Sequence, residues 1–457
     1  MLFPRKALSC FHLKLLCVKT KNGKSISGIF TVIMLLQRQI IYLLRTVTQP
    51  ERDTVMQLRR KISKIAAIML SAAMIGAFGT AGYYSGKLPD KVRSENGRTL
   101  KIAEYPEISC CGYPVSDGSS ASDHVTLSIF GAIPVKYVEV CEEETPVYAA
   151  SGMPFGIKLL MKGVMVTGTA DVEAENGEKV CPAEDAGIEK GDIICLADGV
   201  EVLSNEKLQS IISGSGGNKI SLRIDRGGRE FTTELQPVYS GRSGSWRGGM
   251  WVRDSIAGIG TMTFINKKTG SFAGLGHPIC DADTGELVPV SSGEAVPVEV
   301  SGTKRGEKGI PGELLGTFRR GEKLGDLSVN KESGVYGRLS PETLDDLEIK
   351  EYPLGYRQDI KRGDAEIYTT IKGSKPKSYS IEIEDVDYNS DDSAKNMVIR
   401  ITDPELLEAT GGIVQGMSGS PVIQDGKLIG AVTHVFVADP TRGYAIFAEN
   451  MASELER

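Results

Sequence analysis

The sequence predicts a mainly β protein that carries one apolar helix near its N-terminus. Glycine is frequent, with 53 residues, and aromatic residues make up only 6% of the 457-residue chain. This composition favours many short strands and turns over long helices. From Gly248 onward, short apolar runs alternate with Gly and Pro breaks, as in barrels of antiparallel strands. The chain is too long for one core, so we expect about three units.

The apolar helix is expected within residues 62–84. Ile65 to Tyr84 is a run of 20 residues without a charge, which is about enough to span a bilayer. Four basic residues between Arg59 and Lys64 precede the run, and positively charged flanks stay in the cytoplasm. The sequence therefore predicts a transmembrane anchor with the bulk of the chain outside. A cleaved signal peptide, with a cleavage region at Ala77–Ala81, and a buried core helix are the alternatives.

Residues 1–55 form a basic extension. The first 50 residues contain no acidic residue, whereas the whole chain has a net charge of −6. This split suggests membrane orientation and does not suggest nucleic-acid binding by the body. Met56 begins a basic-then-apolar segment with a complete export signature of its own. We therefore interpret residues 1–55 as an upstream artefact of translation, and residues 85–145 as a tether and strand region.

Residues 146–237 are expected to form the next unit. Pro182 to Ile194 reads PAEDAGIEKGDII and resembles the signature of PDZ domains. A short helix over Asn205–Ser213 and strands over Ile220–Asp225 and Glu230–Leu235 fit this fold. The residues expected to form the carboxylate-binding loop are Pro154, Phe155, Gly156 and Ile157. A bound peptide would add there as a strand; an empty or self-occupied groove is the alternative.

Residues 238–457 carry the motif that points to chemistry. Gly416 to Pro421 reads Gly-Met-Ser-Gly-Ser-Pro, the form in which trypsin-like enzymes usually present a nucleophilic serine, here Ser418. The glycines leave room for a substrate carbonyl, and they let the backbone amides of Gly416 and Ser418 turn toward one point as an oxyanion hole. The alternative is an ordinary glycine-rich turn between strands.

A serine hydroxyl needs an imidazole to accept its proton, and the imidazole needs an acceptor that fixes its tautomer. Of the four histidines in the chain, His277 is the best base, because it lies in a loop context well before Ser418. Spacing alone leaves several acids open: Asp281, Asp283, Asp387, Asp391 and Asp403. Thr433 and His434, in the strand-like run after the nucleophile, are expected to line the substrate cleft; a strand histidine without a ligand role is the alternative.

Four segments together resemble the SpoIVB-type serine peptidases of spore-forming bacteria. They are 248–264, GLGHPICDADTG at 274–285, KGIPGELLGTF at 308–318, and 402–447, which contains GMSGSP. The resemblance covers all but the N-terminal extension. It implies a PDZ domain followed by a trypsin-like double β-barrel, with His277 as base, Asp403 as acid and Ser418 as nucleophile. It implies no metal and no organic cofactor.

The same resemblance implies a membrane-anchored, extracytoplasmic serine endopeptidase that acts between the forespore and mother-cell membranes. Such an enzyme would cleave itself and a membrane regulator of an intramembrane protease, so that a sigma factor is activated. Its PDZ domain would bind a peptide end or a segment of its own chain. The alternatives are a quality-control protease of the HtrA group, which usually places the peptidase before the PDZ domain, and a PDZ scaffold with an inactive barrel.

Overall fold

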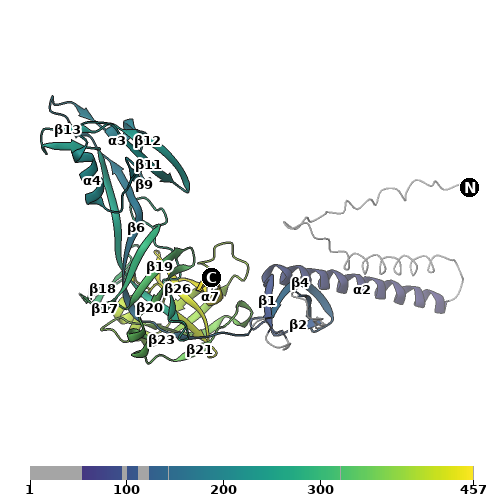
Figure 1. Cartoon of the computed structure of the whole chain (residues 1–457). Helices are drawn as coiled ribbons and strands as arrows, with labels where there is room; N and C mark the ends of the chain where they lie inside the picture. Colours follow the sequence, from purple (N-terminus) through teal and green to yellow (C-terminus); the bar gives the residue numbers. More distant parts are fainter. Residues whose placement is uncertain (1–53, 95–99, 112–122, 143, 320, 456–457) are drawn as a thin grey trace, which may run out of the picture. The chain divides into compact units, whose positions relative to one another are not determined.

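The computed structural model describes residues 54–94, 100–111, 123–142, 144–319 and 321–455 (Figure 1). The predicted extension over residues 1–55 lies outside this part, apart from its last two residues. The chain divides into two compact units, Met1–Thr80 and Ala81–Arg457, which we describe separately. Helix α2 (Thr54–Lys87) contains the expected apolar helix. Over Arg59–Lys87 it is long and apolar enough to cross a membrane, with a mean hydropathy of 1.8.

A small β-sheet domain follows the helix, where the sequence suggested a tether with strands. Its strand order is β1-β4-β3-β2, with β1 parallel to β4. The strands are β1 (Lys91–Ser94), β2 (Ile108–Cys111), β3 (Asp123–Ile129) and β4 (Ile133–Glu142). One face of the sheet is apolar and packs Leu88, Ile102, Leu127 and Val138 into a core of its own. Residues 88–142 therefore include an independent hydrophobic core.

The PDZ-like region contains the elements that the sequence predicted. The predicted helix is α4 (Asn205–Gly214), and the two predicted strands are β11 (Ile220–Arg226) and β12 (Arg229–Leu235). The region also contains α3 (Pro182–Asp185), β9 (Ile193–Ala197), β10 (Val200–Glu201) and the short pair β7 (Val172–Glu173) and β8 (Lys179–Val180). Ser204 caps α4 by accepting a hydrogen bond from the amide of Lys207. Leu208 and Ile212 of α4 pack on the buried faces of β9 and β11. The glycine-rich stretch after β12 forms a hairpin of β13 (Val238–Ser240) and β14 (Ser245–Arg247).

Two 16-residue strands, β6 (Pro154–Thr169) and β15 (Met250–Ile265), each belong to two parts of this unit. They pair antiparallel from Met250 with Thr169 at one end to Thr261 with Pro154 at the other. Figure 1 shows β6 running between β9 and β11 on one side and β17 and β19 on the other. The C-terminal half of β6 thus completes the PDZ-like sheet, and its N-terminal half belongs to a barrel.

This first barrel is a closed ring in which β6, β17, β19, β20, β16 and β15 pair in that order. The remaining strands of the ring are β16 (Ser271–Gly274), β17 (Val290–Lys304), β19 (Gly325–Lys331) and β20 (Gly334–Leu339). The elements that flank it are β5 (Val147–Ala150), β18 (Glu313–Phe318), α5 (Pro341–Asp345) and β21 (Glu351–Pro353). Phe155, Leu159 and Phe272 are fully buried inside it.

The second barrel closes in the order β22-β23-β24-β27-β26-β25. Its strands are β22 (Gly363–Thr369), β23 (Lys377–Val386), β24 (Met397–Ile401), β25 (Pro421–Gln424), β26 (Lys427–Phe436) and β27 (Asp439–Phe447). The 3-10 turn η1 (Arg357–Asp359), α6 (Pro404–Thr410) and α7 (Ala448–Leu455) complete the fold. A mainly β fold with a PDZ-like region and a barrel in the peptidase region agrees with the predicted fold class.

One expectation needs correction. Pro154 to Ile157, expected as a loop that presents backbone amides, lies inside β6 and is buried between β15 and β17. The physical reason is close strand packing, because a Cβ on Gly156 would lie 2.6 Å from a methyl carbon of Val296. These residues are thus in the first barrel, whereas the sequence interpretation placed them in a unit over 146–237.

Candidate active site

Ser418 lies in the loop that connects α6 to β25. The flanking glycines Gly416 and Gly419 both have φ of +96°, a conformation that other residues rarely adopt. A Cβ on Gly419 would lie 2.0 Å from the carbonyl oxygen of Thr261 and 2.6 Å from the amide nitrogen of Leu275. Between the glycines, Met417 is fully buried in the second barrel. The glycines therefore allow this loop to pack directly against strand β15 and the loop after β16.

The amides predicted to form an oxyanion hole have no partner within the described part of the chain. Met417 donates its amide hydrogen to the carbonyl of Val414, and Gly419 to that of Val432. Of the backbone groups of Gly416 and Ser418, by contrast, only the carbonyl oxygens are engaged. The Gly416 carbonyl accepts from the Thr261 hydroxyl at 2.7 Å, and the Ser418 carbonyl accepts from the Thr261 amide at 3.0 Å. Two unpaired N–H groups one residue apart are suited to bind an anionic oxygen.

His277 follows a left-handed turn at Leu275 and Gly276, with φ of +68° and +71°. A Cβ on Gly276 would lie 3.0 Å from a carbon of Thr433, so this loop of the first barrel lies against β26 of the second. The His277 Nδ1 is 2.8 Å from the carbonyl oxygen of Pro278. Because a carbonyl only accepts, this contact puts the ring hydrogen on Nδ1 and leaves Nε2 as the basic nitrogen. Burial lowers the pKa of His277, so the imidazole is neutral near pH 7.

His434 is the neighbour of His277 across the two barrels. The two ring centroids are 5.1 Å apart and the rings are tilted by 40°. Desolvation, followed by the charges of His277 and Lys395, lowers the pKa of His434 to about 4. Its neighbour Thr433 donates its hydroxyl hydrogen to the carbonyl of Ala394 at 2.8 Å. The structure therefore brings both predicted cleft residues next to the candidate base.

The Ser418 hydroxyl donates to the carbonyl oxygen of Thr433 at 2.8 Å. Within the described ranges, no hydrogen bond joins Ser418 to His277 or to His434. Serine and imidazole thus lie on adjoining loops that meet at β26, but the hydroxyl is engaged with a backbone carbonyl. Catalytic hydrogen bonds often form only when substrate is bound.

Asp403, which the resemblance gives as the acid, is the N-cap of α6. Its carboxylate accepts from the amide of Leu406 at 3.0 Å and from that of Ser380 at 3.4 Å. In the described structure it makes no hydrogen bond or ion pair with either histidine. Two of the other candidate acids serve turns or neighbouring strands: Asp281 is buried and pairs with Arg253, and Asp387 accepts from the amide of Asn389.

The carboxylate with an electrostatic effect on His434 is one that the sequence interpretation missed. Asp392 opposes the lowering of the His434 pKa, although it is itself paired with Lys395 at 2.7 Å. The only sequence signal was the pair Asp391-Asp392 in an acidic stretch that also suits a solvated loop. Asp392 joins the site because the Thr433 hydroxyl of β26 holds its loop through the Ala394 carbonyl, a contact between distant segments that a local motif does not reveal.

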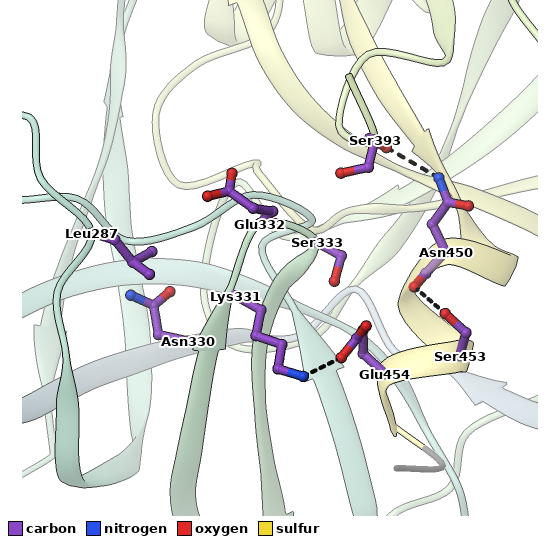
Figure 2. A pocket seen from close by; sticks show the side chains of 9 residues that line it. All are labelled: Leu287, Asn330, Lys331, Glu332, Ser333, Ser393, Asn450, Ser453 and Glu454. Carbon is purple, nitrogen blue, oxygen red and sulfur yellow. Dashed lines mark hydrogen bonds and ion pairs between the residues drawn. The ribbon is translucent and has the colours of Figure 1, made fainter. Parts of the chain in front are cut away.

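A cavity of about 430 Å³ lies beside the histidine loop (Figure 2). Asn330 on its wall holds Ile279, two residues after His277, through hydrogen bonds of 2.8 Å to both its amide and its carbonyl. Opposite, the Ser393 carbonyl accepts from the side chain of Asn450 at 3.2 Å, and Lys331 is paired with Glu454. Most residues of the cavity wall are polar or charged by type, but the surface that they expose to the cavity is mainly apolar.

The described part of the chain contains no group of three or more His, Cys, Asp or Glu residues that could hold a metal ion. What the arrangement offers is a hydroxyl, a neutral imidazole and two free amides. This set is sufficient for acyl transfer without a metal.

Comparisons with known proteins support a peptidase that carries a PDZ domain. Residues 244–452 match the model of the SpoIVB peptidase S55 family, and residues 174–226 match that of a PDZ domain. Among curated proteins, one from Neisseria meningitidis is 29% identical over 34% of this chain, and one from Bartonella henselae is 34% identical over 18%. Both bear names of zinc metalloproteases. The chain spans 32% and 22% of their lengths.

Two solved structures have partial similarity. The PDZ domain of the SdrC-like protein from Listeria monocytogenes matches 20% of this chain and 87% of its own, at 18% identity and a TM-score of 0.16. The Rv3671c protease in its inactive form matches 43% of this chain and 83% of its own, at 14% identity and a TM-score of 0.25.

Proposed function

We propose that this chain, a SpoIVB-type peptidase with a PDZ domain ahead of its S55 peptidase domain, is a serine endopeptidase with Ser418 as nucleophile and His277 as base. One observation carries the proposal. The amides of Gly416 and of Ser418 itself are unpaired within the described structure, and the loop that carries them packs against the loop of a half-buried, neutral histidine.

The proposed reaction begins when the Ser418 hydroxyl turns from the Thr433 carbonyl to Nε2 of His277. His277 accepts the proton as the serine oxygen attacks the scissile carbonyl carbon. The oxygen that becomes negative is bound by the amides of Gly416 and Ser418. His277 then gives its proton to the leaving amine, and a water molecule repeats the sequence to release the acyl group and restore the serine.

In this proposal the Pro278 carbonyl holds His277 in the productive tautomer. The resemblance assigns this task to Asp403, whose carboxylate is occupied at the start of α6. For Asp403 to reach His277, the first turn of α6 would have to rearrange. Because α6 leads into the nucleophile loop, capping by Asp403 also supports the loop indirectly.

We further propose that Thr433 and His434 line the substrate cleft. Thr433 accepts the hydroxyl of Ser418 through its carbonyl, and His434 is exposed on β26 next to His277. Exchange of His434 for alanine should then change the preferred cleavage sequence. An unchanged cleavage rate and sequence preference would limit His434 to a structural role in the strand.

The wider role is also a proposal. A helix able to span a membrane precedes the catalytic unit, and basic residues on its N-terminal side favour a body outside the cytoplasm. Together with the family resemblance, this supports an anchored, self-cleaving enzyme that cuts a membrane regulator of an intramembrane protease during sporulation. Its PDZ domain is proposed to bind a peptide or a protein C-terminus.

Self-cleavage of the full chain in detergent tests the proposed activity. We expect fragments from the unaltered chain, and none from Ser418→Ala or His277→Ala at unchanged melting temperature. Ser213→Ala, an exposed serine on α4, is the matched control and should cleave as the unaltered chain does. Equal fragmentation of Ser418→Ala in pure protein would contradict the proposal.

A further inference from the structure

Strand β15 begins on the open edge of the PDZ-like sheet. The sheet runs β12-β11-β9-β6, and β15 pairs with the edge of β6 that β9 leaves free. Met250 lies opposite Thr169, Trp251 opposite Gly168, and Val252 opposite Val166, all antiparallel. The chain's own strand therefore extends this sheet.

The same segment packs against the apolar cluster under helix α4, beside a cavity of about 840 Å³ that α4 and the segment line together. Met250 and Val252 pack against the apolar cluster that contains Leu208 and Ile212 of α4. The amide of Ala170 donates to the carbonyl of Gly249 at 2.9 Å. Trp251, which alternates with them along the strand, is 68% exposed. Met250 and Val252 thus point inward, Trp251 points outward, and the main chain pairs with β6. A strand added to a sheet edge makes the same contacts.

PDZ domains bind their ligands by β-strand addition: an extended peptide joins a sheet edge, and alternate side chains enter pockets. We propose that residues 248–253 occupy this peptide groove, so that an external extended peptide with two alternating apolar side chains binds only by displacing them. We call this segment the internal ligand.

The internal ligand is joined to the candidate active site by two sets of contacts. Arg253 at its end forms ion pairs with Asp281 and Asp283, the latter at 2.7 Å, in the turn that follows His277. Farther along the same strand, about 26 Å from Arg253, Thr261 holds the carbonyls of Gly416 and Ser418. Displacement of the internal ligand would break the first set and release one end of the strand that provides the second.

In this proposal the enzyme has two states, which differ in whether the internal ligand or an external peptide occupies the groove. With the internal ligand in place, the Ser418 hydroxyl is engaged with Thr433 and Ser418 reacts slowly. An external peptide in the groove frees the Arg253 end of the strand and the turn after His277. The contacts of Thr261 stay in place, and the reactivity of Ser418 rises. This consequence rests on the proposed function, whereas occupancy of the groove does not.

Binding tests the occupancy directly. The probe is a fluorescent peptide that copies residues 246–256, added to the full chain carrying Ser418→Ala, so that nothing is cleaved. The double variant Met250→Asp/Val252→Asp places charges against the apolar cluster and should empty the groove. In the parent, the tethered segment competes with the peptide at an effective concentration in the mM range. The peptide should therefore bind the double variant about tenfold or more tightly than it binds the parent. The control Trp251→Asp, altered on the exposed side, should bind as the parent does.

A reversible disulfide between β6 and β15 gives a second test, which holds even if the double variant misfolds. Trp251 and Gly168 are opposite in the register, and a Cβ on Gly168 meets no atom within 4 Å. Opposed residues lie about 4.5–5.5 Å apart between Cα atoms, which a disulfide accepts. In Gly168→Cys/Trp251→Cys, oxidation should abolish peptide binding and protect the amides of residues 164–169 from hydrogen exchange, and reduction should reverse both. Equal binding to the oxidised and reduced forms would overturn the occupancy.

The consequence is measured as the rate at which a fluorophosphonate labels Ser418 in the otherwise unaltered chain. The emptied double variant should label faster than Trp251→Asp, within the roughly 5-fold to 150-fold range of allosteric coupling. Equal rates, despite tighter peptide binding, would overturn the coupling and leave the occupancy. Absence of labelling in every form would instead count against the proposed function.

Discussion

The backbone amide of Thr261 in the first barrel donates a hydrogen bond of 3.0 Å to the carbonyl oxygen of Ser418 in the second. The Thr261 hydroxyl adds a bond of 2.7 Å to the carbonyl of Gly416. One residue thus fixes both carbonyls of the nucleophile loop and leaves the amides of Gly416 and Ser418 unpaired. The geometry of the candidate oxyanion hole therefore depends on strand β15 as well as on the loop sequence.

Thr261→Val should weaken this loop. The change keeps the side-chain shape but leaves the half-buried carbonyl of Gly416 without its partner. The cost in the free energy of unfolding should lie at or below the lower end of the roughly 1–3 kcal/mol that a fully buried unpaired acceptor costs. We expect a lower denaturation midpoint and slower labelling of Ser418. Thr263→Val is the matched control two residues along, since its buried hydroxyl has no partner in the described structure; it should be neutral or stabilising. A Thr261→Val protein as stable and reactive as its parent would contradict this role.

Gly419→Ala should be more damaging than the same change elsewhere in the left-handed region. Its Cβ would lie 2.0 Å from the Thr261 carbonyl oxygen, so strand and loop must separate. At Gly426, which has φ of +75° and no atom within 4 Å of its Cβ, only backbone strain of roughly 1–2 kcal/mol arises. Thermal unfolding and labelling of both variants check the prediction. Equal losses at the two positions would show that the contact with β15 does not matter.

Activity should persist below the ordinary pKa of histidine. Burial lowers the pKa of His277, and the base works only when neutral, so the acid limb of the labelling rate should have its midpoint below about pH 6.5. A midpoint at or above that value would contradict the assignment of the half-buried His277 as the base.

Stability should follow the same histidines with a defined sign. Their pKa values are lowered in the folded state, to about 4 for His434, so the unfolded chain binds protons first as the pH falls below about 6.5. The folded state therefore loses stability from there toward pH 4. His434→Gln should lose less stability than the parent over this interval in denaturant titrations, and a parallel pH dependence would refute the assignment.

Two substitutions can separate the effect of the Asp403 charge from its role as the N-cap of α6. Asparagine caps a helix as well as aspartate does, whereas alanine costs about 1 kcal/mol. From the structure we expect Asp403→Ala to lower the melting temperature, and Asp403→Asn to keep both stability and most of the labelling rate. Loss of labelling in Asp403→Asn at unchanged stability would assign Asp403 to the reaction, as the family resemblance implies.

The features that were predictable from the sequence are local ones. The glycines around Ser418 and the PAEDAGIEKGDII segment are short motifs of neighbouring residues. The helix and the hairpin of the PDZ-like region are also formed by short continuous segments. Their physical causes, positive φ and alternating burial, operate over the same short range.

What the sequence did not reveal depends on pairing between distant segments. Pro154–Ile157 has the composition of a loop, yet it becomes a buried strand because β15 and β17, more than 90 residues later, pair with it. A self-occupied groove was left open by the sequence, and residues 248–253 are proposed as its occupant because of the register of β15 with β6. The effect of Asp392 on His434 likewise arises from contact between distant segments, because the loop that carries Asp392 is bonded to β26 through Ala394 and Thr433.

The most direct test of the central claim is the mass of the tryptic peptide that contains Ser418 after the full chain reacts with a fluorophosphonate. The account predicts a single phosphonate adduct on Ser418 in the parent, and none in His277→Ala at equal stability. An unmodified Ser418 in folded parent protein, with the groove emptied as well as occupied, would contradict it, as would an adduct that forms equally well without His277.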